Sequence, residues 1–385
     1  MTMNNDVLSE ILLRLPVLSL LRFRAVCKTW GNIIDSKPFR KLHTHNNYIN
    51  NNTSDDMVHL QLTHSYGQDK VCLQVSFHNG GNRVKKKLSI KLECDWEPQL
   101  ASQFNHSSRL VDAVRGLICM NCEFTVPIAI CNPFLGELKL LPPSNSSCDL
   151  VWQRNVAIGF DEDYKVVQLL SCDQHDYLHA QIYSKSTDSW RDLGDVCIDD
   201  VKFYAVYPIK SACKNGYFVH WLGDANEVGG DGVSKILSFD MKNEVFRAIT
   251  LPEDYAHIYY DGDTRPLCHI FAEDEHSFRI FDFSIYGSDN LVRIYDSRCE
   301  GSELSWNHVM NVHVPLSISE IEVPLCRTSC VFFVDRSDES VCVYDYRARK
   351  FISRYSLPDF KPFYYGVVCL DRIIEYKGSL VSLEN

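Results

Sequence analysis

Four cysteines of this chain have spacings that could bind a metal ion. Cys119-Met-Asn-Cys122 places two thiols at a spacing that zinc sites use, and Cys326 and Cys330 form a looser pair. A structural zinc site needs four ligands, and neither pair has a matching second pair. The 16 cysteines are scattered, and we interpret the many that lie in apolar runs as small buried side chains in a reducing compartment. We therefore expect no metal site.

Two acidic runs could carry out acid–base chemistry. Asp161-Glu162-Asp163 and Asp199-Asp200 both lie in turn-like sequence, where solvated carboxylates are the ordinary interpretation. The 14 histidines are dispersed along the chain. The sequence has no glycine-rich phosphate loop, no zinc-protease motif and no serine-hydrolase motif. We therefore predict no catalytic residue and no cofactor.

The N-terminal part of the chain has the apolar periodicity of short helices. We expect a first helix that begins near Asp6 and ends at Pro16, because the proline ring blocks its continuation. A second helix is expected from Ser19, a good N-cap residue, to Trp30. A third is expected to open at Asn32. Three short helices would then make one small unit.

This helical segment is basic and too small to bury all of its apolar side chains. About 40 residues rarely stabilise a fold alone, and an exposed apolar face on such a unit is best explained by a partner. Residues 1–48 carry seven Lys/Arg and three Asp/Glu, a net charge of +4, whereas the remainder has 32 basic and 47 acidic residues, or −15. An acidic partner would suit the helices and a basic one the remainder, although solubility alone also explains the acidic remainder.

From about residue 57 onward the sequence indicates β-strands and repeats itself. A strand-like run reaches a turn, and a second run follows that often ends in Leu-Pro. Alignment of the repeats superposes five turn residues at steps of 52, 56, 56 and 49, namely Asn132, Ser184, Asp240, Asp296 and Asp345. A period near 50 with several short strands is typical of a kelch-like β-propeller.

We predict a small all-α module of three helices over 1–48, a polar linker over 49–56 and an all-β propeller of about six blades over 57–385. Each four-stranded blade would cover its neighbour, because one sheet cannot bury both of its faces alone. Residues 364–383 would close the ring against the first strands. A double-sheet sandwich is the competing architecture, although about 330 residues is long for one.

The N-terminal sequence DVLSEILLRLPVLSLLRFRAVCKTWGNIIDSKPF resembles the F-box, a helical module that joins a protein to a cullin-type ubiquitin ligase through a Skp-family adaptor. Later phrases such as RGLICM, ICNPFLGELKLLPP, IYSKSTDSWRDL and LSFDMKNEVFRAITLP resemble, in order, the F-box-associated interaction domain of plant F-box proteins, similar to the S-locus F-box group. The resemblance implies adaptor contacts through a Leu-Pro pair and neighbouring apolar residues. These residues are Leu8, Ile11, Leu12, Leu15, Pro16, Leu20 and Leu21.

The resemblance implies a non-catalytic substrate receptor of an SCF-type ubiquitin ligase. The propeller loops would bind an unidentified protein target, and the adaptor would connect the chain to a cullin and a RING subunit. We expect no membrane span and no nucleic-acid partner, and a cytoplasmic or nuclear location. The alternative is a propeller enzyme or a small-molecule-binding propeller whose helical segment packs against the body and buries Leu15, Pro16, Leu20 and Leu21.

Overall fold

The computed structural model describes a helical module and most strands of an all-β domain. The residues that it describes are 5–47, 57–64, 71–78, 84–92, 109–121, 128–144, 151–172, 175–208, 210–211, 216–226, 232–252, 268–272, 276–282, 291–300, 303–313, 321–324, 330–335, 340–356, 370–375 and 378–383. The linker predicted over 49–56 lies outside these ranges, so its boundaries stay a prediction. No helix within the described ranges is long and apolar enough to cross a membrane.

Four short helices form the N-terminal module, where three were expected. They are α1 (Asn5–Leu12), α2 (Val17–Phe23), α3 (Lys28–Asp35) and α4 (Lys37–His45). Because α2 begins directly after Pro16, Ser19 lies inside the helix and does not cap it. Ser36 is the residue that caps a helix, since its Oγ accepts a hydrogen bond from the backbone N–H of Phe39 at 3.4 Å.

The helix expected from Ser19 to Trp30 is divided at Cys27, whose backbone is extended. The division brings the rings of Phe23 and Trp30 into edge-to-face contact, with 5.1 Å between their centroids. In one continuous helix these two residues would lie about 10 Å apart along the axis. The aromatic contact, which a helical pattern does not reveal, therefore accompanies two short helices rather than one long one.

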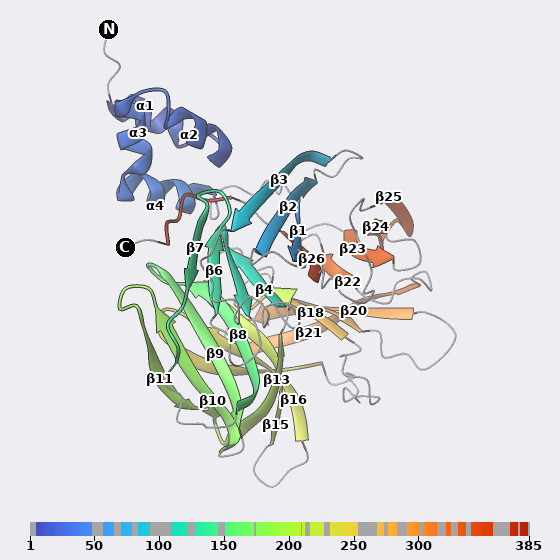
Figure 1. Ribbon diagram of the computed structural model, residues 1–385. Helices are drawn as coiled ribbons and strands as arrows, with labels where there is room; N and C mark the ends of the chain where they lie inside the picture. The colour runs from blue at the N-terminus through green and yellow to red at the C-terminus, as the bar shows by residue number, and fades with distance from the viewer. Residues whose placement is uncertain are drawn as a thin grey trace.

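Six sheets form the rest of the described chain, as predicted for a six-bladed propeller (Figure 1). We number them blades 1 to 6. Blade 1 consists, in spatial order, of β26 (Leu370–Glu375), β1 (Met57–His64), β2 (Val71–His78) and β3 (Val84–Leu92). Blade 2 consists of β4 (Arg109–Val114), β5 (Leu117–Asn121), β6 (Ala129–Asn132) and β7 (Glu137–Leu140). Blade 3 consists of β8 (Val151–Phe160), β9 (Tyr164–Cys172), β10 (His175–Ser184) and β11 (Ser189–Asp195). Blade 4 consists of β12 (Cys197–Ile198), β13 (Val201–Pro208), β15 (Phe218–Asn226), β16 (Gly232–Asp240) and β17 (Val245–Thr250). Blade 5 consists of β14 (Lys210–Ser211), β18 (Cys268–Ala272), β19 (Phe278–Asp282), β20 (Leu291–Glu300) and β21 (Glu303–His313). Blade 6 consists of β22 (Ile321–Pro324), β23 (Cys330–Asp335), β24 (Ser340–Asp345) and β25 (Lys350–Ser356).

Strand β26 closes the ring. It pairs antiparallel with β1, with Met57 opposite Glu375, and it also lies against β4 and β22 of the two neighbouring blades. Blade 1 therefore combines one strand from late in the chain with three early strands. The prediction that residues 364–383 close the ring is confirmed for β26, whereas 378–383 pack against blades 2 and 3 and 364–369 lie outside the described residues.

The propeller core consists of apolar clusters between neighbouring blades. The cluster between blades 3 and 4 includes Phe203, Trp221 and Phe239, all of them fully buried. Further clusters lie between blades 2 and 3, between blades 4 and 5, and between blades 5 and 6. At these four contacts, from blade 2 to blade 6, each blade thus covers a face of its neighbour, and burial contributes about 25 cal/mol per Å² of apolar area.

The turns that repeat in the sequence join the third and fourth of the main strands in four blades. Each turn ends in a residue with positive φ, four positions after the aligned residue: Gly136, Asp188, Glu244 and Arg349. In three of the turns the Oδ1 atom of the aligned residue accepts backbone N–H groups two and three positions ahead. These three residues are Asn132, Asp240 and Asp345. The alignment therefore identified a local capping interaction.

The alignment is wrong at Asp296. Strand β20 continues through this residue and pairs with β21 as far as Glu300, which lies opposite Glu303. The Asp296 carboxylate instead binds Arg279 of β19, at 2.6 Å to Nε and 2.8 Å to Nη2. A bidentate ion pair and a turn cap both use aspartate, so residue type alone did not separate them.

Candidate functional site on the helical module

Three of the seven residues expected to contact an adaptor lie inside the helical module. Leu8, Leu12 and Leu20 are buried in one apolar cluster, to which α3 contributes Ile34 and α4 contributes Phe39. These leucines hold the four helices together. They underlie the surface on which a partner would bind.

The other four expected residues reach the surface at α1 and beyond it. Leu15 and Leu21 are half-buried, whereas Ile11 and Pro16 are exposed. Val7 lies one helical turn before Ile11, and the two residues are 51% and 49% exposed. Neighbouring exposed apolar side chains on a small unit indicate a surface for a partner. The adaptor contact itself stays a prediction.

The turn after α1 is held in place and remains accessible. His43 is fully buried, and its Nε2 donates a hydrogen bond to the Leu15 carbonyl at 2.9 Å. The intramolecular alternative required Leu15, Pro16, Leu20 and Leu21 to be buried. Among these four residues Leu20 alone is fully buried, and Pro16 is exposed.

Two further exposed apolar residues of the module were not among the predicted site residues. Val26 follows α2 and is 61% exposed, and Leu42 in α4 is 45% exposed. Basic residues also lie exposed on all four helices or next to them: Arg14, Arg22, Lys28, Lys37 and Lys41. Asp35 is bound by Arg24 at 2.8 Å and by Arg40 at 2.7 Å, so it is not available to an outside cation. Exposed apolar and basic residues thus both occur on the module, together with the exposed acidic residues Asp6 and Glu10 of α1. The net charge of +4 on residues 1–48 suits an acidic partner.

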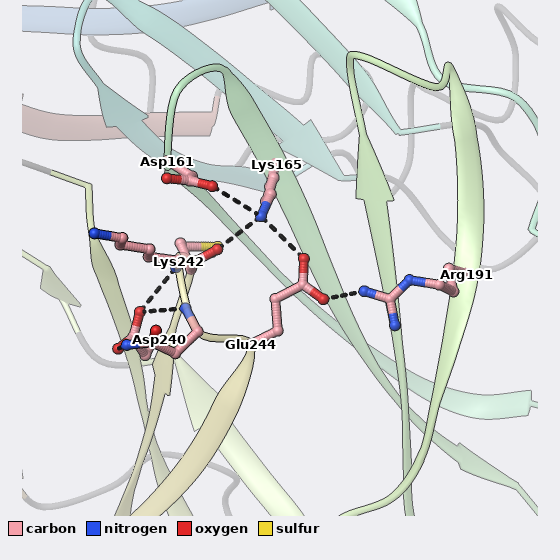
Figure 2. Close-up of polar contacts among 8 residues, drawn as sticks. Asp161, Lys165, Arg191, Asp240, Lys242 and Glu244 are labelled. Carbon is pink, nitrogen blue, oxygen red and sulfur yellow. Dashed lines mark hydrogen bonds and ion pairs between the residues drawn. The ribbon is translucent and has the colours of Figure 1, made fainter.

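An acidic turn of the propeller is bound to basic side chains (Figure 2). Lys165 Nζ lies 3.4 Å from Asp161 Oδ2 and 2.9 Å from Glu244 Oε1, and it donates to the Met241 carbonyl at 2.8 Å. Arg191 binds the second carboxylate oxygen of Glu244. Burial opposes ionisation of Glu244, but Lys165 and Arg191 outweigh it and lower the pKa of this carboxyl. The network joins blades 3 and 4 and has the character of a structural ion pair.

The other residues considered for acid–base chemistry or metal binding are the second acidic run and the cysteine pairs. Asp199 and Asp200 form the turn between β12 and β13, with φ angles of 48° and 65° that acidic residues tolerate. Both acidic runs therefore occupy turns, as predicted. Cys119 is buried in β5, whereas Cys122 and Cys326 lie outside the described residues. Within the described ranges, no three His, Cys, Asp or Glu side chains gather to hold a metal ion.

Comparison with known families matches both parts of the chain. A model of the F-box domain matches residues 2–42, and a model of the F-box associated beta propeller domain matches residues 65–382. The chain belongs to the F-box proteins with an F-box-associated propeller. The four helices are accordingly its F-box, and the six sheets are its F-box-associated domain.

Plant relatives agree with this assignment. A putative F-box protein of Arabidopsis thaliana is 22% identical over 366 residues, which cover 89% of this chain and 82% of the relative. An F-box/kelch-repeat protein of the same plant is 24% identical over 361 residues, which cover 88% of this chain and 82% of the relative. Among solved structures, a hypothetical selenium-binding protein from Sulfolobus tokodaii aligns with a TM-score of 0.42 and 11% identity, over 79% of this chain and 75% of that one. That similarity is too low to say anything of function.

Proposed function

We propose that this F-box protein is the substrate receptor of an SCF-type ubiquitin ligase. The observation that carries the proposal is an F-box with an accessible Leu-Pro turn in the same chain as an F-box-associated propeller. The F-box would bind a Skp-family adaptor, and through it a cullin and a RING subunit. A receptor holds its target near the conjugating enzyme and so raises the effective concentration, which requires no catalytic residue of its own.

The proposed adaptor contact covers one face of α1 and the turn that follows. Val7, Ile11 and Pro16 are exposed there, with Leu15 and Leu21 half-buried beside them. Burial of one aliphatic side chain contributes about 1.5–3 kcal/mol, so two or three would provide much of a specific interaction. The net charge of +4 on residues 1–48 would favour an acidic adaptor surface during association.

The target would bind the propeller and not the F-box. Residues 49–385 carry a net charge of −15, which would attract a basic target at low salt. Loops on the rim of a propeller are the natural place for such a contact, because they vary without disturbing the blades. The proposed place of action is the cytoplasm or the nucleus.

Affinity purification of two versions of the full chain tests this division of roles. In the first version, Ile11→Asp and Pro16→Ala change the proposed adaptor contact. In the second, Val245→Asp changes a propeller residue of similar exposure, 50%, and serves as the matched control. We expect adaptor and cullin to be lost from the first version and kept by the second. Equal recovery of adaptor and cullin with both versions, or their absence from the wild type, would contradict the proposal.

A further inference from the structure

A short segment after β26, Gly378–Leu383, lies between the F-box and blade 2, and we call it the strap. In Figure 1 it is the dark-red trace that passes between α4 and β7. Its residues contact the helical module on one side and two propeller blades on the other. The strap is therefore placed to join the two domains.

The F-box side of the strap is apolar. Leu380 is 1% exposed and belongs to the interior cluster of the F-box helices. Phe134 and Leu135, from the turn between β6 and β7, pack against the same cluster. Gly378 lies so close to the Phe134 ring that a Cβ atom there would come within 2.7 Å of it. The F-box cluster thus extends into the propeller through three apolar side chains.

The propeller side of the strap is bound to two blades. Leu383 is buried in the cluster between blades 2 and 3, and Val381 packs against that cluster. Glu137 of β7 accepts hydrogen bonds from Ser382 Oγ at 3.0 Å and from the Leu383 N–H at 2.6 Å. Lys185 of blade 3 donates to the Ser382 carbonyl at 2.9 Å. These contacts fix the path of the strap over the propeller.

Asn132 binds the strap and the turn at the same time. Its side chain is fully buried, and Nδ2 donates to the Ser379 carbonyl at 3.1 Å and to the Val381 carbonyl at 2.7 Å. Its Oδ1 accepts the N–H groups of Phe134 at 3.0 Å and Leu135 at 3.4 Å. One amide therefore holds the strap on both sides of Leu380 and also holds the turn that meets the F-box.

Comparison with the equivalent turns shows that the donor group of the Asn132 amide, and not its acceptor oxygen, is specific to blade 2. Asp240 and Asp345 accept the corresponding two backbone N–H groups with a carboxylate oxygen, and Ser184 takes the position in blade 3. A carboxylate has no donor, whereas an amide both accepts and donates. Among the four described turns of this type, the amide occurs in the blade that meets the F-box.

We infer that the strap fixes the orientation of the F-box relative to the propeller and that Asn132 is the positioning residue for this contact. A fixed orientation would keep a bound target at a constant distance from the rest of the ligase. That consequence rests on the proposed receptor function. The orientation itself is a property of this chain alone, so it can be tested with or without an adaptor.

The distance between two spin labels in the full chain tests the inference. We would place the labels, as noncanonical amino acids, at Arg22 in α2 and Ser186 in the turn between β10 and β11, both exposed. Asn132→Asp removes the two donated hydrogen bonds and keeps the accepting oxygen. Leu380→Ala removes most of the apolar contact. Asp345→Asn makes the reverse exchange in an equivalent turn and is the matched control.

We expect one narrow distance distribution in the wild type and in Asp345→Asn. Asn132→Asp and Leu380→Ala should broaden it and shift it to longer distances, while thermal unfolding of the propeller stays cooperative. A distribution as narrow as that of the wild type in either folded variant would overturn the inference. Adaptor binding is measured separately on the unlabelled chain, which keeps Arg22, and its absence in the wild type would count against the proposed function without changing the interpretation of the distances.

Discussion

Two buried polar side chains determine how the F-box presents its surface. His43 holds the turn after α1 through the Leu15 carbonyl, and Asn132 holds the segment that carries Leu380 into the F-box interior. Buried hydrogen bonds of this kind specify one arrangement of the chain, because an alternative arrangement would leave a polar group without a partner. The repeat pattern identified Asn132 as a turn residue but not its hydrogen bonds to the segment around Leu380, and no pattern identified the role of His43.

His179 should make stability depend on pH. In β10 its Nε2 lies 3.0 Å from Asp192 Oδ2, and its Nδ1 lies 3.1 Å from Asp195 Oδ1. Burial lowers the pKa of His179, but hydrogen bonds to Asp195 and Asp192 outweigh it and raise the pKa above its ordinary value of 6.5. The stabilisation is therefore fully present below pH 6.5 and is lost as the pH rises through the raised pKa.

Melting temperatures of the wild type and His179→Gln across this pH range measure the effect. We expect the melting temperature of the wild type to exceed that of the variant most below pH 6.5, and we expect this difference to narrow as the pH rises. A gap that stays constant, or that widens with rising pH, would contradict the assigned partners.

Gly116 and Gly136 form a matched pair for testing how closely the strap packs. Both have positive φ, 77° and 70°, so alanine at either position costs about 1–3 kcal/mol in backbone strain. A Cβ atom at Gly116 would lie 2.4 Å from Ser379 Oγ, whereas nothing lies within 4 Å of one at Gly136. Denaturant unfolding should therefore show a larger loss in the free energy of unfolding for Gly116→Ala than for Gly136→Ala. Equal losses would mean that the strap moves aside freely.

At the scale of helices and strands, the sequence predicts the features that short-range hydrogen bonds determine. The capped turns at Asp240 and Asp345 repeat the same short-range hydrogen bonds, so their alignment recovered the blades and their approximate number. Asp296 was misplaced because its partner, Arg279, lies in another strand. The helix expected through Cys27 is divided, and the contact between Phe23 and Trp30 that accompanies the division is not visible in a helical pattern.

For the proposed adaptor site, the sequence identifies the apolar residues of the helical module but not which of them reach its surface. An apolar stripe shows that a helix has a covered face, but it does not show whether a neighbouring helix or another protein covers it. Leu12 and Leu20 therefore lie inside the F-box, while Ile11 and Pro16 lie at its surface. The sequence predicted that the strap residues pack on the propeller, but not that they contact the F-box or bind partners such as Lys185, about 200 residues away.

Lys165 should be the side chain that connects blades 3 and 4 most strongly by polar contacts. It is bound to Glu244, Asp161 and the Met241 carbonyl, and Lys165→Met would leave a partly buried carboxylate with fewer donors. We expect a loss of about 1–3 kcal/mol in the free energy of unfolding. Lys242→Met, in the adjacent turn, is the control. Similar small losses for both variants would argue against a connecting role.

At the scale of the whole molecule, the F-box and the propeller share an apolar contact. The F-box keeps Ile11 and Pro16 at its surface, and it takes Leu380, Phe134 and Leu135 from the propeller into or against its interior. The contact thus leaves the proposed adaptor surface accessible. Because Leu380 is buried in the F-box cluster and Phe134 and Leu135 pack against it, the F-box is stabilised by the domain that would carry the target.

Calorimetric titration of the purified full chain with a purified Skp-family adaptor tests the central claim most directly. We predict a specific complex with the wild type and with Val245→Asp, whereas Ile11→Asp combined with Pro16→Ala should weaken binding at least about tenfold, the equivalent of about 1.4 kcal/mol. Far-ultraviolet circular dichroism confirms that the variants are folded. Binding that is undetectable in the wild type, or unchanged in the folded double variant, would contradict the account.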